Sequence, residues 1–248
     1  MHGKECTSTS PQYMINAGGA VLRTYPGHPL FTVLSAPAGT WTDPYITVGY
    51  NDSVPSTMCY AHALLNGKYA DPEDDKLPVR LGHIGWIKAG VRDYTPGGFR
   101  GDSGFDIWLT ANPAHTSYDE LVKQGGSTTE VMIWLNHPGL YVQSPNVRFY
   151  PVTIDGKRWY VQIALASQWQ RTASHPDGWN VVDFIAPKVA NGYTTDIGLT
   201  LNGFLTYAIS HGWLKPHDYL MSVNQGFEFT SGGAGAAVKG YSLTGINR

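Results

Sequence analysis

The most constraining feature of this sequence is an alternation of apolar and polar residues that recurs in three separate segments. Successive side chains in an extended strand point to opposite faces. In TEVMIWLN, residues 129–136, one face therefore carries Val131, Ile133 and Leu135. The other face carries Glu130, Met132, Trp134 and Asn136. The first set fits a core. The second combines a carboxylate with Met and Trp, which is unusual for a face exposed to water, and it indicates the wall of a groove.

Two further segments repeat this pattern. In FDIWLTAN, residues 105–112, the apolar face opposes Asp106, Trp108, Thr110 and Asn112. In YLMSVNQGFEF, residues 219–229, it opposes Ser222, Asn224, Gly226 and Glu228. Apolar runs between Gly-, Pro- and Asn-containing turns predict more strands at about 45–50, 58–65, 80–94, 147–154, 158–166 and 180–186.

One segment has helical spacing instead. In LTLNGFLTYAISHG, residues 199–212, the apolar residues are Leu201, Phe204, Leu205, Ala208 and Ile209. Gly212 follows where a helix cap would lie. We expect one helix packed on the strands.

Composition agrees with a β-rich fold. The 248 residues include 29 Gly and 16 Pro, with 12% aromatic and 15% charged residues, which suits short strands and turns better than helical bundles. No repeat or low-complexity linker divides the chain. We therefore predict a single domain over residues 1–248, a mostly antiparallel, all-β sandwich with one helix and a concave cleft.

The charge balance excludes several partners. With 17 basic and 19 acidic residues, a net charge of −2 and no basic run, the chain lacks the footprint of a nucleic-acid or anionic-membrane binder. No apolar stretch reaches the roughly 18–20 residues that span a bilayer. The beginning, MHGKECTSTS, has no signal-peptide core, so the protein is either cytosolic or a mature secreted chain. Cys6 and Cys59 are either one disulfide or two free thiols.

Three acids suggest chemistry. Glu130, Glu228 and Asp106 each lie on the polar face of a predicted strand. A single strand carboxylate usually points to water, but two that face each other across a groove could flank a glycosidic bond. Trp108 and Trp134 would then offer flat surfaces to sugar rings.

Other chemistries have weaker support. GDSG, residues 101–104, is similar to a trypsin-like nucleophile loop. A trypsin-like chain would have its base histidine far upstream in an Ala-His-Cys context and its serine late in the sequence. Here the nearest upstream histidine, His62, lies in YAHALL, and Ser103 comes early, so the sequence argues against a protease. The sequence has no metal-ligand motif and no phosphate-binding loop. We expect no metal and no cofactor.

The last 150 or so residues resemble glycoside hydrolase family 12, the compact β-jelly-roll endoglucanases and xyloglucanases. The resemblance lies in the order and spacing of FDIWLTANPAH (105–115), TEVMIWLN (129–136), VVDFIAP (181–187) and NQGFEFTSGGAG (224–235). It implies a jelly roll whose helix packs on the convex side. It also implies that Glu130 is the nucleophile, Glu228 the general acid/base, and Asp106 the acid that shares a hydrogen bond with the nucleophile.

The resemblance further implies retention of anomeric configuration, with the two Glu carboxyls about 5–5.5 Å apart. Met132 would lie on the cleft floor, and Trp134, Trp108 and Asn224 would complete the substrate-binding surface. A Cys6–Cys59 bridge and a secreted location are also implied.

The sequence departs from the family pattern in three places. Phe227-Glu228-Phe229 replaces a common Thr-Glu-Pro, residues 119–126 form an insertion, and the Asn-Asn-x-Trp motif that supplies a sugar-stacking Trp is missing. Trp41, Tyr45 or Tyr50 could replace that Trp.

The resulting hypothesis is a monomeric, retaining endo-β-1,4-glucanase that acts on cellulose, mixed-linkage glucan or xyloglucan. The alternative is a non-catalytic carbohydrate-binding jelly-roll module, which would need groove aromatics but no opposed carboxylates.

Overall fold

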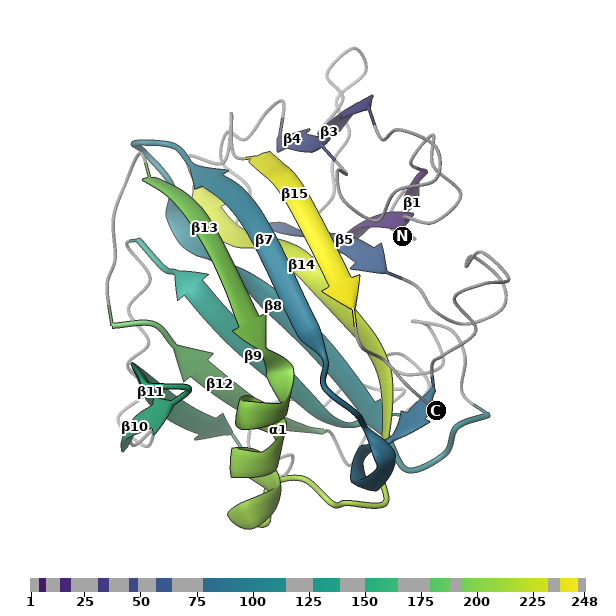
Figure 1. The fold of residues 1–248 in the computed structure, drawn as a ribbon. Coiled ribbons are helices and arrows are strands. Elements are labelled where there is room, and N and C mark those ends of the chain that lie inside the picture. Colours follow the sequence, from purple (N-terminus) through teal and green to yellow (C-terminus); the bar gives the residue numbers. More distant parts are fainter. Residues whose placement is uncertain are drawn as a thin grey trace.

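The protein is described by a computed structural model in which two β-sheets pack face to face. The backbone is described for residues 5–7, 14–18, 31–35, 45–48, 57–63, 78–114, 127–138, 150–164, 179–187, 193–231 and 237–244. Side chains are described for residues 78–114, 128–138, 150–163, 179–187, 197–221, 223, 225 and 226. Figure 1 shows the smaller sheet lying over the larger one.

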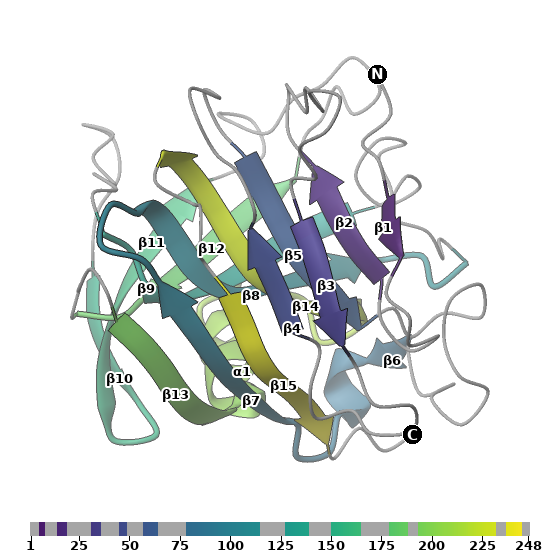
Figure 2. The same ribbon diagram turned by 90° about the horizontal axis from the view of Figure 1, so that it is seen from above.

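The large sheet has ten strands. Along the sheet they are β1 (Glu5–Thr7), β2 (Met14–Gly18), β5 (Thr57–Ala63), β14 (Tyr219–Ser231), β8 (Arg100–Thr110), β9 (Ser127–Asn136), β12 (Asn180–Ile185), β11 (Lys157–Ala164) and β10 (Tyr150–Ile154), with β6 (Val79–Arg80) beside β14. Strands β9 and β12 are parallel, and every other strand pair described in this sheet is antiparallel. Seen from above, β10 and β1 lie at opposite ends of this sheet (Figure 2).

The small sheet has five strands. Their order is β13 (Tyr193–Thr200), β7 (Lys88–Thr95), β15 (Ala237–Thr244), β4 (Tyr45–Val48) and β3 (Phe31–Ser35). The helix α1 (Leu201–Ser210) continues directly from β13, and a short 3-10 helix, η2 (Leu81–His83), joins β6 to β7. This architecture confirms the predicted mostly antiparallel β-sandwich with a helix.

The core lies between the sheets. The apolar faces predicted from the alternation are buried in one continuous cluster that includes Phe105, Ile107, Val131, Ile133 and Val223. Each fully buried side chain of this size contributes about 1.5–3 kcal/mol to folding. The polar residues between them therefore face away from the small sheet, on what we call the outer face.

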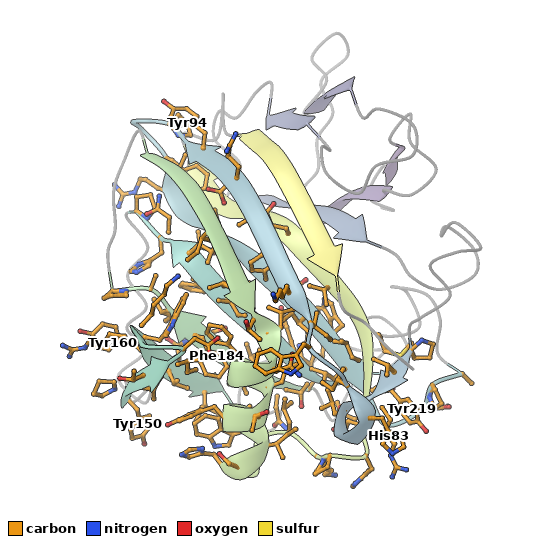
Figure 3. All side chains as sticks on the ribbon, in the orientation of Figure 1. His83, Tyr94, Tyr150, Tyr160, Phe184 and Tyr219 are labelled. Atoms are coloured by element: carbon orange, nitrogen blue, oxygen red, sulfur yellow. The ribbon has the colours of Figure 1, made fainter. Side chains whose placement is uncertain are left out.

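The helix packs on the inner side of the large sheet. Its buried residues are Leu201, Phe204, Leu205 and Ala208, four of the five predicted apolar positions. The Phe204 ring meets Trp159 edge-on at 5.0 Å and Phe184 at 5.1 Å between centroids. Phe184 is labelled beside the beginning of α1 in Figure 3. The helix thus covers β11 and β12, beyond the edge of the small sheet.

The prediction of one strand over residues 80–94 was wrong. The chain crosses from one sheet to the other there: β6 pairs with β14, and β7 pairs with β13 and β15. Backbone bonds from Leu81 to Asp218 and from Gly82 to Pro216 hold the crossing. Strands β1, β2, β3, β13 and β15 were not predicted.

Asn136 was assigned to the wrong face. The β8–β9 register shifts between the pairs Ser103–Asn136 and Gly104–Trp134, so one extra residue lies in β9. Such a bulge reverses the facing of the residues beyond it. The Asn136 amide accordingly donates a 2.7 Å hydrogen bond to the Thr95 hydroxyl on β7, inside the sandwich.

GDSG lies within β8 and is not a loop. Ser103 is 0% exposed, and its hydroxyl has no hydrogen-bond partner among the described residues. A nucleophilic serine must reach its substrate, so this position disfavours the protease hypothesis.

Two earlier expectations stay predictions. Strand β2 lies between the strands that carry Cys6 and Cys59, and both thiols fall outside the described side chains, so the disulfide is untested. That residues 1–248 form one domain is likewise a prediction. Trp41 and Tyr50 fall outside the described residues, as does the Tyr45 side chain.

Candidate active site

The strand register gathers five of the seven predicted site residues, all but Glu228 and Trp134, into two rows across the large sheet. One row crosses β14, β8, β9, β12 and β11 as Asn224, Asp106, Met132, Asp183 and Gln162. The next row crosses the same strands as Ser222, Trp108, Glu130, Val181 and Ala164. Directly opposed residues in a sheet lie about 4.5–5.5 Å apart, and diagonal ones about 7–8 Å. Glu130 therefore has Asp106 and Asp183 as diagonal neighbours.

Glu130 is held by a tryptophan that the sequence analysis did not single out. Its side chain is 5% exposed, and its Oε2 accepts a 2.7 Å hydrogen bond from the indole N–H of Trp179. Trp179 immediately precedes β12, whose Val181 pairs with Glu130. A buried donor of this kind orients a carboxylate and favours its ionised form.

Asp106 has a matching donor. It is 3% exposed, and its Oδ2 accepts a 2.7 Å hydrogen bond from the indole N–H of Trp108, two residues along the same strand. The predicted hydrogen bond between Asp106 and Glu130 stays a prediction.

The two donor indoles contact each other. The centroids of Trp108 and Trp179 lie 5.6 Å apart with the rings tilted by 57°, within the range of favourable aromatic contacts. They pack in one cluster with Val181 and Met221. The two carboxylates are therefore connected through a pair of packed rings.

Trp108 and Trp134 are too deeply buried for a sugar ring to stack on them in this structure. They are 3% and 7% exposed. The Trp134 indole donates to the Met132 sulfur at 3.5 Å. Stacking on sugar rings stays a prediction for both, and it needs ring surface that this structure does not expose.

Asp183 is the carboxylate that the sequence analysis missed. It lies opposite Met132 on β12 and is 3% exposed. The signal was available, because Asp183 alternates with the core residues Val182 and Phe184 in NVVDFI, as Glu130 alternates with Val131 in its own strand.

The position of Glu228 is known only from the backbone. In the register of β14 with β8, Asn224 lies opposite Asp106 and Glu228 lies opposite Asp102. Asp102 is six positions along β8 from Trp108, the residue opposite Glu130, which is about 20 Å of extended strand. The Glu228 and Asn224 side chains are outside the described set. The predicted separation of 5–5.5 Å between the Glu130 and Glu228 carboxyls is thus untested. It requires a strand register in which the two residues lie closer together than this offset along the sheet.

Two negative findings concern the described part of the chain. Its residues include no group of three or more His, Cys, Asp or Glu that could hold a metal ion. None of its helices is long and apolar enough to cross a membrane.

Comparison with solved structures supports the fold. The xyloglucanase of family 12 from Bacillus licheniformis matches with a TM-score of 0.68 at 19% identity, over 98% of this chain and 97% of that one. The endoglucanase Cel12A from Rhodothermus marinus matches with a TM-score of 0.67 at 20% identity, over 98% and 95%. The endo-1,4-β-glucanase CelB2 matches with a TM-score of 0.66 at 21% identity, over 98% and 96%.

No curated protein sequence matches the chain. The sequence pattern of glycosyl hydrolase family 12 matches residues 71–245, well over half of the chain. This match includes every predicted site residue and favours an enzyme over a carbohydrate-binding module. The chain belongs to glycosyl hydrolase family 12 and is a glycoside hydrolase.

Proposed function

We propose that this protein is a retaining endo-β-1,4-glucanase that hydrolyses internal bonds of β-glucans. The observation that carries the proposal is Glu130, a carboxylate on the outer face of the large sheet, held by the Trp179 indole with a second carboxylate, Asp106, diagonal to it. Family membership supports the reaction class. The similar structures described as endo-1,4-β-glucanase and xyloglucanase support β-glucans as the substrate class.

The proposed reaction has two displacements. In the first, a Glu130 oxygen forms a bond to the anomeric carbon while the glycosidic C–O bond breaks. The bonding electron pair goes to the departing oxygen, which takes a proton from Glu228. In the second, Glu228 accepts a proton from water, whose oxygen attacks the anomeric carbon and releases Glu130 as a carboxylate.

Asp106 is assigned a supporting role. Lying diagonal to Glu130 and held by Trp108, it would keep the nucleophile in position through the predicted hydrogen bond. Met132, directly between Asp106 and Asp183 in the row, would form the floor beneath the reacting sugar, and Asn224 would bind sugar hydroxyls on the β14 side.

Three further parts of the proposal concern context. The small net charge of −2 agrees with a neutral polysaccharide partner and not with nucleic acid or membrane. We propose that the enzyme acts as a secreted monomer.

The test is a hydrolysis screen of the wild-type enzyme on barley glucan, carboxymethyl cellulose, xyloglucan and xylan, with product lengths measured. An endo-enzyme releases oligosaccharides of mixed length. Exclusive release of single terminal sugars, or no hydrolysis of any glucan, would contradict the proposal. The relative rates on barley glucan and xyloglucan distinguish the two proposed substrate preferences.

Two variants separate the proposed roles. Glu130→Gln should lower kcat on the order of 10³-fold or more on every substrate. Glu228→Gln should do so on polysaccharide but lose much less on aryl glycosides with good leaving groups, which need little proton donation. Ser103→Ala is the control and should retain hydrolysis, since Ser103 is buried within β8.

A further inference from the structure

Two tryptophans donate hydrogen bonds to the two carboxylates at the centre of the outer face. Trp179 donates to Glu130 and Trp108 donates to Asp106, each at 2.7 Å. All four side chains are at most 5% exposed. Because the donors are enclosed, water competes poorly for these bonds.

Trp179 is placed for this contact by the parallel pairing of β9 and β12. Asn180, the next residue, lies opposite Thr129, and Val181 lies opposite Glu130. The indole therefore reaches from the beginning of one strand to the carboxylate of its neighbour. The indole also packs against the Trp108 ring and lies in one cluster with Val181 and Met221, and this packing limits rotation of Trp179.

An indole N–H can donate a hydrogen bond but cannot accept one. It therefore stabilises the ionised carboxylate, which is the form that a nucleophile needs. Trp179 contributes this without supplying a competing proton acceptor.

We propose that Trp179 is a positioning residue that holds Glu130 ionised and in a single orientation, with the Trp108 ring as its support. This inference rests on the proposed function, in which Glu130 is the nucleophile. The Trp108–Trp179 pair makes Asp106 and Glu130 one rigid unit, so that the two carboxylates keep their relative orientation while the sugar ester forms and breaks.

The first test is Trp179→Phe, which removes the N–H and keeps an aromatic ring. Loss of a hydrogen bond to a charged group should lower kcat about 10- to 100-fold, with KM changed less than about threefold. The acidic limb of the kcat/KM profile should move to higher pH, because the ionised carboxylate has lost a donor.

Trp159→Phe is the matched control. Trp159 is 2% exposed in the core and its indole N–H has no hydrogen-bond partner among the described residues. Trp159→Phe removes the same atoms as Trp179→Phe, but it should leave kcat and the pH profile of kcat/KM unchanged. Trp179 can also be replaced by benzothienylalanine, which keeps the bicyclic shape and lacks the N–H. This second variant separates loss of the donor from a packing defect.

A second readout does not depend on activity. The chain has 8 Trp residues, so ¹⁵N-labelling of tryptophan gives eight indole N–H signals, assigned by the Phe variants. Glu130→Gln should shift the Trp179 signal and leave the Trp159 signal unchanged.

The outcomes are distinguishable. An unmoved Trp179 signal overturns the inference whatever the activity. A Trp179→Phe enzyme whose kcat and pH profile match those of Trp159→Phe also overturns it, while leaving the proposed function intact. A rise in KM alone assigns Trp179 to substrate binding and overturns positioning. If the Trp179 signal responds but the wild-type enzyme hydrolyses no glucan, the proposed function fails and the hydrogen bond stands.

Discussion

Replacing Gly104 with Ala adds a single carbon, which should force apart two strands at the centre of the large sheet. Gly104 lies in β8 two residues before Asp106, opposite Trp134 on β9 and Gly226 on β14. A Cβ there would overlap the carbonyl oxygen of Ile133 and lie 3.0 Å from both Ile133 C and Trp134 Cα. These are backbone atoms, so no side-chain rotation relieves the contact.

The cost follows from this geometry. Relieving the overlap requires β8 and β9 to separate locally, and forced backbone shifts of this kind cost about 1–3 kcal/mol. For a protein of 248 residues, a cost of about 1–3 kcal/mol corresponds to a fall in Tm of about 2–12 °C. Because β8 carries Asp106 and β9 carries Glu130, a displacement near 1 Å could also lower kcat about 100-fold.

The assay is thermal and urea unfolding of Gly104→Ala, followed by hydrolysis per folded molecule at a temperature where the variant is folded. Gly198→Ala is the control, since Gly198 lies in β13 with nothing within 4 Å of its Cβ position. That change should leave stability equal or raise it by about 0.4–1 kcal/mol. Equal stability and equal kcat for both variants would refute the close approach of β8 and β9.

Two further predictions concern pH and the helix. Burial lowers the pKa of His137, and this effect outweighs the hydrogen bond to the Ala186 carbonyl, which raises it. Because the unfolded chain then takes up a proton more readily than the folded one, the folded protein should lose stability as pH falls through about 6.5. Urea unfolding at several pH values should show a smaller loss of stability in His137→Gln. Asn202→Ala removes two hydrogen bonds, one from the Asn202 amide to the Gly85 carbonyl and one from the Ile87 N–H to the Asn202 side-chain oxygen. The free energy of unfolding in urea should fall by about 1–3 kcal/mol, while kcat should not fall. An unchanged urea midpoint would contradict this prediction.

Sequence reasoning predicted the elements in which local pattern and tertiary environment agree. The alternation around Phe105, Val131 and Val223 marked three neighbouring central strands, because each has one face in the core. The helical spacing of Leu201 and Phe204 marked α1 for the same reason. Strand β13 begins YTTD and β15 contains Lys239-Gly240, so neither has a clear apolar face. Their places in the small sheet depend on pairing with β7, which is not a local property.

The site was predicted in outline and missed in its contacts. Period-two alternation placed Glu130, Asp106 and Met132 on one face, and the register agrees. It could not predict the bulge that turns Asn136 into the core, since one extra residue in a strand leaves no mark in composition. Sequence reasoning also predicted that sugar rings stack on Trp108, whereas the Trp108 indole N–H donates a hydrogen bond to Asp106. Trp179 was missed because its partner is 49 residues away in the sequence.

In the proposed reaction Glu130 becomes covalently linked to the sugar. This linkage is tested most directly by treating the enzyme with an activated 2-deoxy-2-fluoro-β-cellobioside, which slows release of the glycosyl-enzyme, and mapping the labelled peptide by mass spectrometry. We expect one label per molecule, on Glu130, and none in Glu130→Gln. A label on Asp106, Asp183 or Glu228, or hydrolysis with inversion and no label, would contradict it.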